Sequence, residues 1–378
     1  MKRRRFLQLG AMATAAPAVL PLSPRTLEGA VTAPWKRPLA NPIRLSNNEN
    51  PLGVAPSARE AITGAMEEGM NQYSFRFRQP VTEAIAAKHG AKPESIVLGN
   101  GSTEVNQMGI QAWLAPDYTV VAPEPTYEDA TRYSQPLGAK LLVFPLTSDG
   151  AHDLEAMEKA ARAAAGPVLF YVCNPNNPTA TTTPSDDVES VIRRAPERVV
   201  FLVDEAYVEF AEDPRYRSLD KLALELPNVI VVRTFSKVYG MAGLRLGYAI
   251  AQPATATKVR AMAAATNTNH LALAAGLASL KAEDHVRATL DENRRAKRFI
   301  EGVLDELELE RLPSHTNFLM HRIPGDQRSY IDRMREVGIL VGRPFPPLLE
   351  WNRLSIGTVE EMEVFAERLR EFRQKAWV

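Results

Sequence analysis

Short apolar runs alternate with helix-like segments between residues 96 and 232, and this alternation restricts the fold more than any other feature. The runs expected to form strands are 96–98, 119–122, 141–144, 168–172, 199–203 and 229–232. Helices are expected from the 99–104 cluster to about 113, and over 126–134, 154–165 and 185–194. Strands that alternate with helices build an α/β fold with a mostly parallel sheet flanked by helices. Ligands of such sheets bind beyond the carboxyl ends of the strands, where this chain has its polar clusters.

The pattern changes after residue 264, which indicates a second, smaller α+β domain. A long helix is expected over 285–307, short strands near 318–321, 339–341 and 353–356, and a final amphipathic helix over 359–374. Two more helices, 57–69 and 81–88, precede the alternating region. The expected division is an export signal at 1–22, a Pro-rich linker or arm at 23–42, an N-terminal part of the small domain at 43–70, a large domain at 71–265 and the remaining small domain at 266–378.

Composition excludes several classes of protein. The 378 residues are enough for two domains, and 45% apolar with 24% charged residues is ordinary for a soluble globular protein. Lys plus Arg and Asp plus Glu both number 45, so no excess charge indicates a nucleic acid or an acidic membrane surface as partner. The single cysteine, Cys173, excludes an intramolecular disulfide and a cysteine-based metal site. The six histidines have no metal-ligand spacing, so no metal is expected.

The N-terminus has the layout of an export signal. Lys2-Arg3-Arg4-Arg5 precedes a mildly apolar, Ala-rich segment at 6–22 that contains small residues suited to cleavage. The run at 3–8 also resembles a twin-arginine signal, although Lys2 stands where Ser or Thr is usual. We therefore expect a periplasmic or secreted protein with no membrane span once the signal is removed. The alternative is a cytoplasmic protein with a disordered basic tail.

Lys237 lies where an apolar strand gives way to a Gly-rich loop. A lysine at the mouth of a buried strand is unfavourable unless its charge is neutralised or its amine reacts. One such reaction is a Schiff base with an aldehyde cofactor, for which a partly desolvated lysine amine is the usual nucleophile. Arg245, eight residues later, would suit the cofactor's phosphate, which a planar guanidinium binds with two parallel hydrogen bonds. The alternative is that Lys237 and Arg245 are surface residues of a loop.

Other polar residues also follow the expected strands. The segment Gly101-Ser102-Thr103-Glu104 places small residues and free N–H groups at a helix start, which suits either an anion site or a simple helix cap. Asp204 ends an apolar strand, where a carboxylate needs a cation such as a protonated pyridine nitrogen, unless it only caps a helix.

Three more side chains offer contacts to a flat aromatic ligand. Asn177 and Tyr207 could hydrogen-bond a phenolate oxygen, and the ring of Tyr127 could stack on the ligand. A strand-end Asp, a strand-end Lys about thirty residues later and an Arg eight further on form a combination that is more specific than any lone motif.

These motifs lie within longer segments that cover nearly everything after residue 43. The segments are Ser46-Asn47-Asn48-Glu49-Asn50-Pro51-Leu52-Gly53, Pro125-Thr126-Tyr127, Asn174-Pro175-Asn176-Asn177-Pro178-Thr179, Asp204-Glu205-Ala206-Tyr207, Ser236-Lys237, Ala242-Gly243-Leu244-Arg245, Pro313-Ser314-His315-Thr316-Asn317-Phe318 and Arg353-Leu354-Ser355-Ile356-Gly357. In this order they resemble the fold-type I pyridoxal-phosphate-dependent aminotransferases of class I/II, and most closely the histidinol-phosphate aminotransferases.

The resemblance implies pyridoxal 5'-phosphate as cofactor and a role for each matching residue. Lys237 would form the Schiff base and move the substrate proton, Asp204 would hold the pyridinium, and Tyr127 would stack on the ring. Asn177 and Tyr207 would bind the ring oxygen. The residues implied at the phosphate are Gly101, Ser102, Thr103, Glu104, Ser236, Arg245 and, from the partner subunit of a homodimer with shared sites, Tyr73. The residues implied at the substrate are Arg353 for its anionic group, Asn50 in a loop that closes over it, and Arg343 as a weaker candidate.

Two positions depart from the family pattern. Ala180 stands where Gly is usual after Asn-Pro-Thr, and Ser102-Thr103 replaces a commoner Ala followed by Ser or Asp. Neither change removes a catalytic group.

The implied reaction transfers an amino group between an amino acid, or histidinol phosphate, and a 2-oxo acid. Members of the same fold act as racemases, decarboxylases or oxidative deaminases, and these motifs do not separate the reactions. A non-catalytic sensor is the alternative outside the enzymes, but such regulators normally carry an added DNA-binding domain, for which we see no room before residue 43. No residue selects one donor.

Overall fold

The computed structural model describes residues 42–113, 115 and 117–378. The expected export signal, and all but the last residue of the expected linker, lie outside the described residues.

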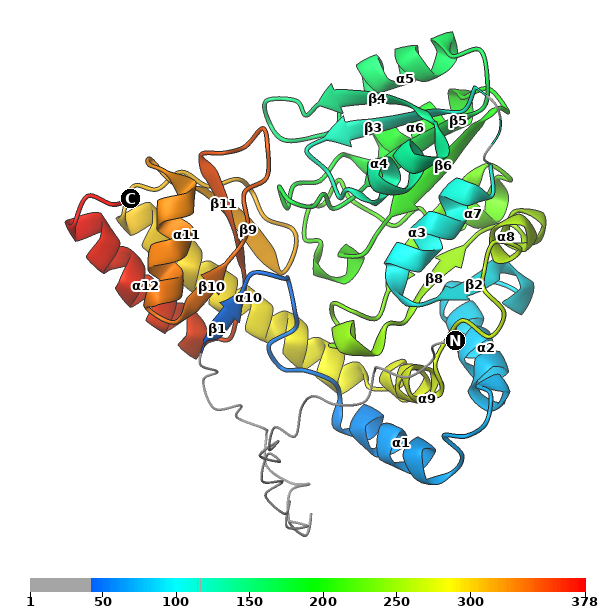
Figure 1. The fold of residues 1–378 in the computed structure, drawn as a ribbon, viewed down its shortest axis with the longest axis horizontal. Coiled ribbons are helices and arrows are strands. Elements are labelled where there is room, and N and C mark those ends of the chain that lie inside the picture. The colour runs from blue at the N-terminus through cyan, green and yellow to red at the C-terminus, as the bar shows by residue number, and fades with distance from the viewer. Residues whose placement is uncertain (1–41, 114, 116) are drawn as a thin grey trace, which may run out of the picture. The chain divides into compact units, whose positions relative to one another are not determined.

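A seven-stranded sheet forms the centre of the larger part of the described chain (Figure 1). Its strands are β2 (Ile96–Gly99), β3 (Thr119–Glu124), β4 (Lys140–Pro145), β5 (Val168–Cys173), β6 (Val199–Asp204), β7 (Val229–Thr234) and β8 (Gly247–Ile250), in the order β2-β8-β7-β6-β5-β3-β4. Only β8 runs antiparallel to its neighbours in this sheet. The expected mostly parallel sheet is therefore confirmed.

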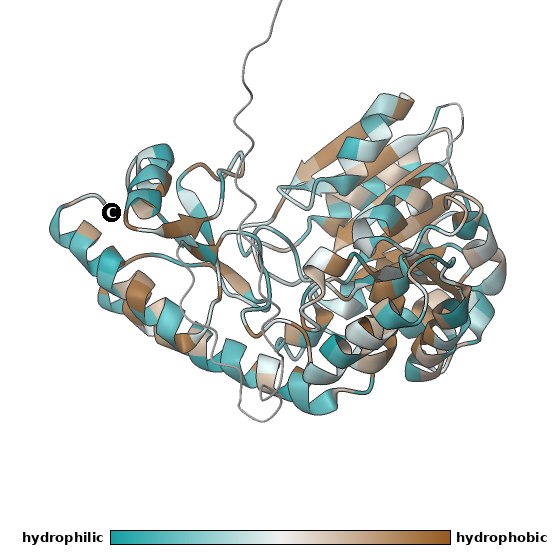
Figure 2. Cartoon of the chain, turned by 60° about the horizontal axis from the view of Figure 1, so that its bottom comes forward, coloured by the Kyte–Doolittle hydropathy of each residue, from teal (hydrophilic) through white to brown (hydrophobic). Residues whose placement is uncertain are grey.

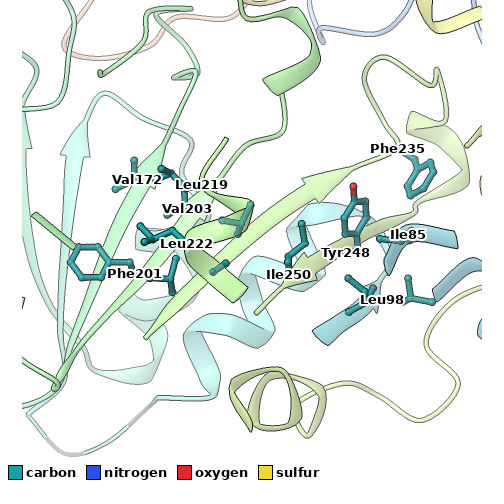
Figure 3. Packing of buried hydrophobic residues seen from close by; sticks show 14 of the residues in the cluster. Ile85, Leu98, Val172, Phe201, Val203, Leu219, Leu222, Phe235, Tyr248 and Ile250 are labelled. Carbon is teal, nitrogen blue, oxygen red and sulfur yellow. The ribbon is translucent and has the colours of Figure 1, made fainter. Parts of the chain in front are cut away.

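Helices cover both faces of the sheet, which explains why its central strands are apolar throughout. Every residue of β5, β6 and β7 is buried, as expected for parallel strands with helices on both sides. On one face a single cluster extends from Phe201, beside Leu222, to Ile85, beside Tyr248 (Figure 3). On the other face Leu202 packs with Met108. The helices of this part include α3 (Gly101–Gln111), α4 (Asp129–Ser134), α5 (Leu154–Ala163), α6 (Ser185–Arg194), α7 (Asp220–Glu225) and α8 (Pro253–Arg260).

A second hydrophobic core holds the smaller part together. The short strand β1 (Ile43–Leu45) pairs in parallel with β10 (Ile339–Val341), and β9 (Phe318–Arg322) pairs antiparallel with β11 (Trp351–Ser355). Three helices pack on these strands, namely α10 (Glu283–Glu306), α11 (Gln327–Glu336) and α12 (Val359–Gln374). Figure 2 shows the helices with hydrophobic and hydrophilic stretches in alternation, as expected for surface helices with one buried side.

The expected domain boundaries need a correction. We expected residues 43–70 and 266–378 in the smaller domain, but α1 (Pro56–Glu67) and α9 (His270–Ser279) bury Ala58 and Leu273 in the core of the larger one. They do so because α9 packs against both α1 and α2 (Phe75–His89). Of the N-terminal segment, it is β1 that packs in the smaller core, through Ile43 and Leu45. Among the described helices, none has the length and apolar character needed to cross a membrane.

Candidate active site

A cavity of about 230 Å³ lies at the carboxyl ends of the central strands. Cys173, Asp204 and Thr234, the last residues of β5, β6 and β7, line its floor side by side. The other lining residues are Asn47, Asn48, Ser102, Thr103, Tyr127, Asn177, Ala206, Tyr207, Ser236, Lys237, Ala242, Arg245 and Arg353. The cavity thus brings together most of the site residues that the sequence predicts.

Lys237 extends into this cavity from the loop after β7. Its Nζ donates to the carbonyl oxygen of Asn48 at 3.3 Å and lies 5.3 Å from the centre of the Tyr207 ring. No carboxylate lies within ion-pair distance of the amine in the described part of the chain. Burial, reinforced by the nearby charge of Arg353, lowers the pKa of Lys237 to about 8. Near neutral pH a useful fraction of this amine is therefore uncharged and nucleophilic.

Asp204 is a carboxylate that the fold buries without a cation. It is 2% exposed, and its partners are donors of hydrogen bonds: the Asn106 amide at 2.8 Å, the Ala206 N–H at 3.0 Å and the Tyr171 hydroxyl at 3.4 Å. Within the described residues no Lys, Arg or His nitrogen lies within 4.0 Å of it. Burial raises its pKa, because the ionised form loses its hydration. A cationic ring nitrogen in the cavity would supply the missing charge.

The opposite end of the cavity is suited to an anion. Ser102 and Thr103 lie in the first turn of α3, where free backbone N–H groups point outward. Arg245 donates to Ser236 Oγ at 3.4 Å and to the carbonyl of Ala242 at 3.0 Å, and no carboxylate pairs with it in the region that the structure covers. This end of the cavity therefore has several hydrogen-bond donors and no negatively charged acceptor among these residues.

Two glycines allow Arg245 and β8 to lie close to the start of α3. Gly101 has φ +77°, and a Cβ there would collide with the guanidinium of Arg245. A Cβ at Gly247 would collide with the backbone of Gly101 and Ser102. The strand β8 can therefore pass directly beneath the first turn of α3 only because residue 247 has no side chain.

Tyr207, Asn177 and a residue that was not predicted, Asn48, form one hydrogen-bonded group. The Tyr207 hydroxyl accepts from Asn48 Nδ2 at 3.1 Å and from Asn177 Nδ2 at 3.5 Å. Asn48 is held in turn by Ser355, which donates to its Oδ1 at 2.9 Å. The ring of Tyr127 borders the cavity next to Thr103, with 3.4 Å between their hydroxyl oxygens. Burial raises the pKa of Tyr127 to about 12, so this phenol stays neutral.

Arg353 is a buried guanidinium with no carboxylate partner in the described chain. It comes from β11 and donates to Asn177 Oδ1 and to the Ser46 carbonyl, both at 2.7 Å. The rings of Phe345 and Phe318 lie 4.6 and 5.5 Å from its central carbon. Burial lowers the pKa of Arg353 to about 10. The Arg353 guanidinium therefore has no counter-ion in the described chain, and an anionic substrate could provide one.

Arg343 lies beside a second, smaller cavity rather than in the first. The second cavity, of about 170 Å³, is also lined by Tyr127, Asn177 and Arg353, which belong to the first cavity as well. Arg343 is exposed, forms an ion pair with Glu128 and stacks at 4.2 Å on the ring of Phe345. Arg343 therefore lies near Arg353 on the second cavity, with its charge already paired.

Besides Gly101 and Arg343, described above, three more predicted site residues do not line the cavity, namely Glu104, Asn50 and Tyr73. Glu104 does not line it, because its carboxylate accepts from Asn267 Nδ2 at 2.9 Å and from the backbone N–H of Asn100. Asn50 is engaged elsewhere, since its amide donates to the Val238 carbonyl at 2.8 Å; Asn47 and Asn48 line the cavity in its place. Tyr73 is 73% exposed and away from its own chain's cavity, and its predicted role in a partner subunit stays a prediction.

The donor set fits pyridoxal 5'-phosphate. A buried carboxylate without a cation suits the pyridinium, the Asn177 and Tyr207 pair suits the ring oxygen, and the uncharged fraction of Lys237 suits the aldehyde. The glycine-lined approach of Arg245 to the start of α3 suits the phosphate. In residues 42–113, 115 and 117–378 no group of three or more His, Cys, Asp or Glu is placed to hold a metal ion.

Comparisons with known proteins agree with this geometry. The family described as aminotransferase class I and II matches residues 40–369. The chain is similar to histidinol-phosphate aminotransferases of Moorella thermoacetica, with 34% identity over 87% of this chain and 85% of that one, and of Symbiobacterium thermophilum, with 35% identity over 87% and 90%. It also resembles the crystal structure of histidinol-phosphate aminotransferase from Sinorhizobium meliloti in complex with pyridoxal 5'-phosphate. That likeness has a TM-score of 0.82 at 28% identity and covers 88% of this chain and 91% of the other.

The matches span the residues that build the cavity, from Asn47 on the first loop to Arg353 on β11. The cavity holds the lysine, the buried aspartate and the anion-binding turn that this chemistry requires. We conclude that the chain belongs to the class I and II aminotransferases and is a pyridoxal-phosphate-dependent aminotransferase of fold type I.

Proposed function

We propose that this aminotransferase acts on a small primary amine that carries one anionic group, and that Arg353 binds that group. The observation that carries the proposal is a buried guanidinium, with no carboxylate partner in the described chain, on the wall of the cavity that contains Lys237. A buried charge without a counter-ion is unfavourable unless a ligand supplies one. Phe318 and Phe345 flank the guanidinium and would exclude water from the ion pair.

Each residue of the cavity has a task in this proposal. When bound, pyridoxal 5'-phosphate supplies a ring that stabilises negative charge at the substrate's Cα. Lys237 takes the proton from Cα, because its amine is partly uncharged near neutral pH. Asp204 holds the proton at the ring nitrogen. Arg353 orients the substrate so that the Cα–H bond faces the Lys237 amine.

Two classes of amino donor carry an anionic group that Arg353 could bind. The relatives named as histidinol-phosphate aminotransferases favour a phosphate ester, and an α-amino acid with its carboxylate at Arg353 is the second candidate. The acceptor would be a 2-oxo acid, whose carboxylate could use the same arginine in the reverse half-reaction.

A single-turnover absorption experiment tests the substrate. The cofactor-loaded protein is mixed with histidinol phosphate and with single α-amino acids, without an acceptor. We expect the aldehyde-form absorption to disappear together with release of one equivalent of the oxo product. If the absorption changes and then recovers with no acceptor present, the reaction with that amine is not amino transfer. If no anionic amine changes the spectrum while neutral amines do, the role of Arg353 is wrong.

We also propose that Tyr73 completes the cofactor site of a second copy of the chain in a homodimer. Tyr73 lies among exposed apolar side chains that would be buried by such a partner, namely Met66, Met70 and Phe75. A concentration-dependent loss of bound cofactor on dilution would support the proposal; monomers that retain the cofactor would contradict it.

Export through a twin-arginine-like signal is proposed on the sequence of residues 1–22 alone. Cell fractionation of the tagged protein, with Arg3 and Arg4 replaced by Lys as control, separates a periplasmic from a cytoplasmic location.

A further inference from the structure

Two buried carboxylates share one amide behind the floor of the active site. Asp129, the first residue of α4, is 3% exposed, and Asp204 is 2% exposed. Between them lies Asn106, a fully buried residue of α3. Its Nδ2 donates to Asp204 Oδ2 at 2.8 Å and to Asp129 Oδ2 at 3.3 Å. Both hydrogens of this amide are therefore used, one on each acid.

The two acids cannot both ionise at low cost. Like charges this close in a buried site push one pKa upward, so that one group keeps its proton. Asp204 has three hydrogen-bond donors, whereas Asp129 has the single longer bond from Asn106. The negative charge therefore belongs on Asp204 and the proton on Asp129.

The guanidiniums of Arg132, Arg343 and Arg353 line the second cavity together with Asp129, but the described chain has no ion pair between any of them and this acid. Arg343 pairs with Glu128, and Arg353 donates to Asn177 and to the Ser46 carbonyl. On the same helix as Asp129, Arg132 lowers the pKa of this acid slightly, but Arg132 is exposed and pairs with Glu128 at 2.8 Å. Acids and phenols also face Asp129: Glu128 directly before it, Asp204 from β6, Tyr171 from β5, Tyr127 from the preceding loop and Tyr133 from its own helix. Burial first, and then the charge of Asp204, raise the pKa of Asp129 to about 7.

We propose that Asp129, acting through Asn106 and Asp204, is a positioning residue that keeps the proton on the cofactor's ring nitrogen as the pH rises. When Asp129 releases its proton to solvent above neutrality, a second negative charge appears behind Asp204. That charge opposes the loss of a positive charge from the ring nitrogen that Asp204 contacts. The ring therefore stays protonated over the alkaline range in which the Lys237 amine is uncharged. Proton removal from Cα needs both a protonated ring nitrogen and an uncharged Lys237 amine, and the two then exist at the same pH.

The first test uses the protein without cofactor. A carboxyl whose pKa is raised in the folded state costs stability as the pH climbs from its unfolded value near 4 through about 7. Asp129→Asn cannot ionise, so its melting temperature relative to the unmodified protein should rise by a few degrees between pH 5 and pH 8.5. Asp149→Asn is the control, because the Thr147 hydroxyl donates to Asp149 and lowers its pKa. Asp149 is therefore ionised in both the folded and the unfolded state over this range, and its removal should lower the melting temperature by an amount that does not vary between pH 5 and pH 8.5.

Coupling between the acids is tested in an Asp204→Asn background. With residue 204 neutral, the pH-dependent gain from Asp129→Asn should shrink, because the repulsion is gone. An equal gain in both backgrounds would overturn the shared-proton arrangement, and so would a gain that does not vary with pH. Asp129→Ser, which is smaller and also neutral, repeats the measurement should the Asn variant fold poorly.

The second test follows the ring nitrogen itself in the loaded enzyme. The nitrogen resonance of 15N-labelled cofactor reports its protonation, and Asp129→Asn should move the alkaline transition to lower pH by about one unit. The alkaline limb of kcat/KM should move by the same amount. A ring transition that stays in place in this variant refutes the proposal, whatever happens to the activity.

Discussion

Asp204 and Glu205 are consecutive residues at the end of β6, and the fold treats them in opposite ways. Both are buried. Glu205 forms an ion pair with Arg233 at 2.8 Å and accepts from the Ser218 hydroxyl and the Leu219 N–H, each at 2.8 Å. Asp204 faces the cavity with no cation beside it in the described chain. The fold itself supplies the cation that balances Glu205, whereas the cation that balances Asp204 must come from a ligand.

The two buried arginines repeat the contrast. Although burial opposes it, the charge of Glu205 raises the pKa of Arg233. Burial lowers the pKa of Arg353, which has no carboxylate partner in the region that the structure describes. A buried charge with a partner therefore contributes to the fold, and a buried charge without one indicates where a ligand binds.

The largest expected effect is on turnover. Lys237→Ala removes the group that moves the substrate proton, and kcat should fall by about 10³-fold or more. The melting temperature of the cofactor-free variant should not fall, because the amine has no ion-pair partner to lose. Steady-state kinetics with the donor measure the first quantity. Lys159→Ala, on the exposed side of α5, is the matched control and should leave kcat unchanged. Normal turnover in Lys237→Ala would refute the mechanism.

The next prediction contrasts the neighbours on β6 directly. Glu205→Gln removes the close carboxylate partner of the buried Arg233, leaving only Glu209 at 3.8 Å, and should cost about 3–5 kcal/mol of unfolding free energy. Asp204→Asn should leave the cofactor-free protein at least as stable and instead weaken cofactor binding. Urea unfolding gives the unfolding free energy of both variants, each measured with and without cofactor. If both substitutions destabilise the cofactor-free protein equally, the distinction between the two carboxylates fails.

A smaller effect is expected at the substrate's anion. Arg353→Ala should raise KM for the donor by roughly 10- to 100-fold, since charged hydrogen bonds contribute about 1.5–3 kcal/mol. Arg343→Ala is the matched comparison, because its guanidinium is exposed and already paired with Glu128. We expect a change in KM of less than about threefold there. Equal changes in both variants would place the anion between the two arginines.

The pH dependence of cofactor capture should follow the Lys237 amine. Its pKa is lowered to about 8, so the neutral form predominates above that pH, whereas an unperturbed lysine would need a pH above about 10. The rate of aldehyde capture by the cofactor-free protein should therefore rise with pH and level off above about 8. Removing the charge of Arg353 should move this inflection to higher pH. An inflection near pH 10 in the unmodified protein would show that the amine is not desolvated.

The smallest effect is expected at Tyr73. Tyr73→Phe removes one hydroxyl and should weaken cofactor binding by only about fivefold, in line with one hydrogen bond of about 1 kcal/mol. Equilibrium dialysis of the cofactor measures it. An unchanged affinity would argue against a shared site.

Long, regular patterns made most of the fold predictable. The structure places α6, α12 and β10 at the expected residues, because the two helices have a clear apolar period and β10 is an apolar run between two glycines. The expectation had no place for α7, which is only six residues long, or for α9, whose sequence HLALAAGLAS is apolar on nearly every side. Tertiary packing, rather than local periodicity, forms such helices.

The site was predictable where chemistry is unusual at the end of a strand. Lys237 and Asp204 are conspicuous because a charge there contradicts the apolar run before it. Asn106 and Asn48 give no such signal, since an Asn in a helix or a loop is ordinary and their partners are distant in the chain. Asn50 was expected in place of Asn48 because an irregular loop, here with φ +56° at Asn48, has no period that tells which side chain points inward.

The pairing of β2 with β8 also determines at which stage of synthesis the active site can form. The two strands lie about 150 residues apart in sequence, and so do Ser102 and Arg245, which together form the phosphate end. At about 5–20 residues per second, a ribosome needs roughly 7–30 seconds to make the second half of this contact. During that interval the nascent chain has the N–H groups of α3 but neither the arginine nor the lysine. Cofactor loading therefore cannot precede the synthesis of β8, which ends at residue 250 of 378, and truncation before β8 should yield chains that never acquire the cofactor.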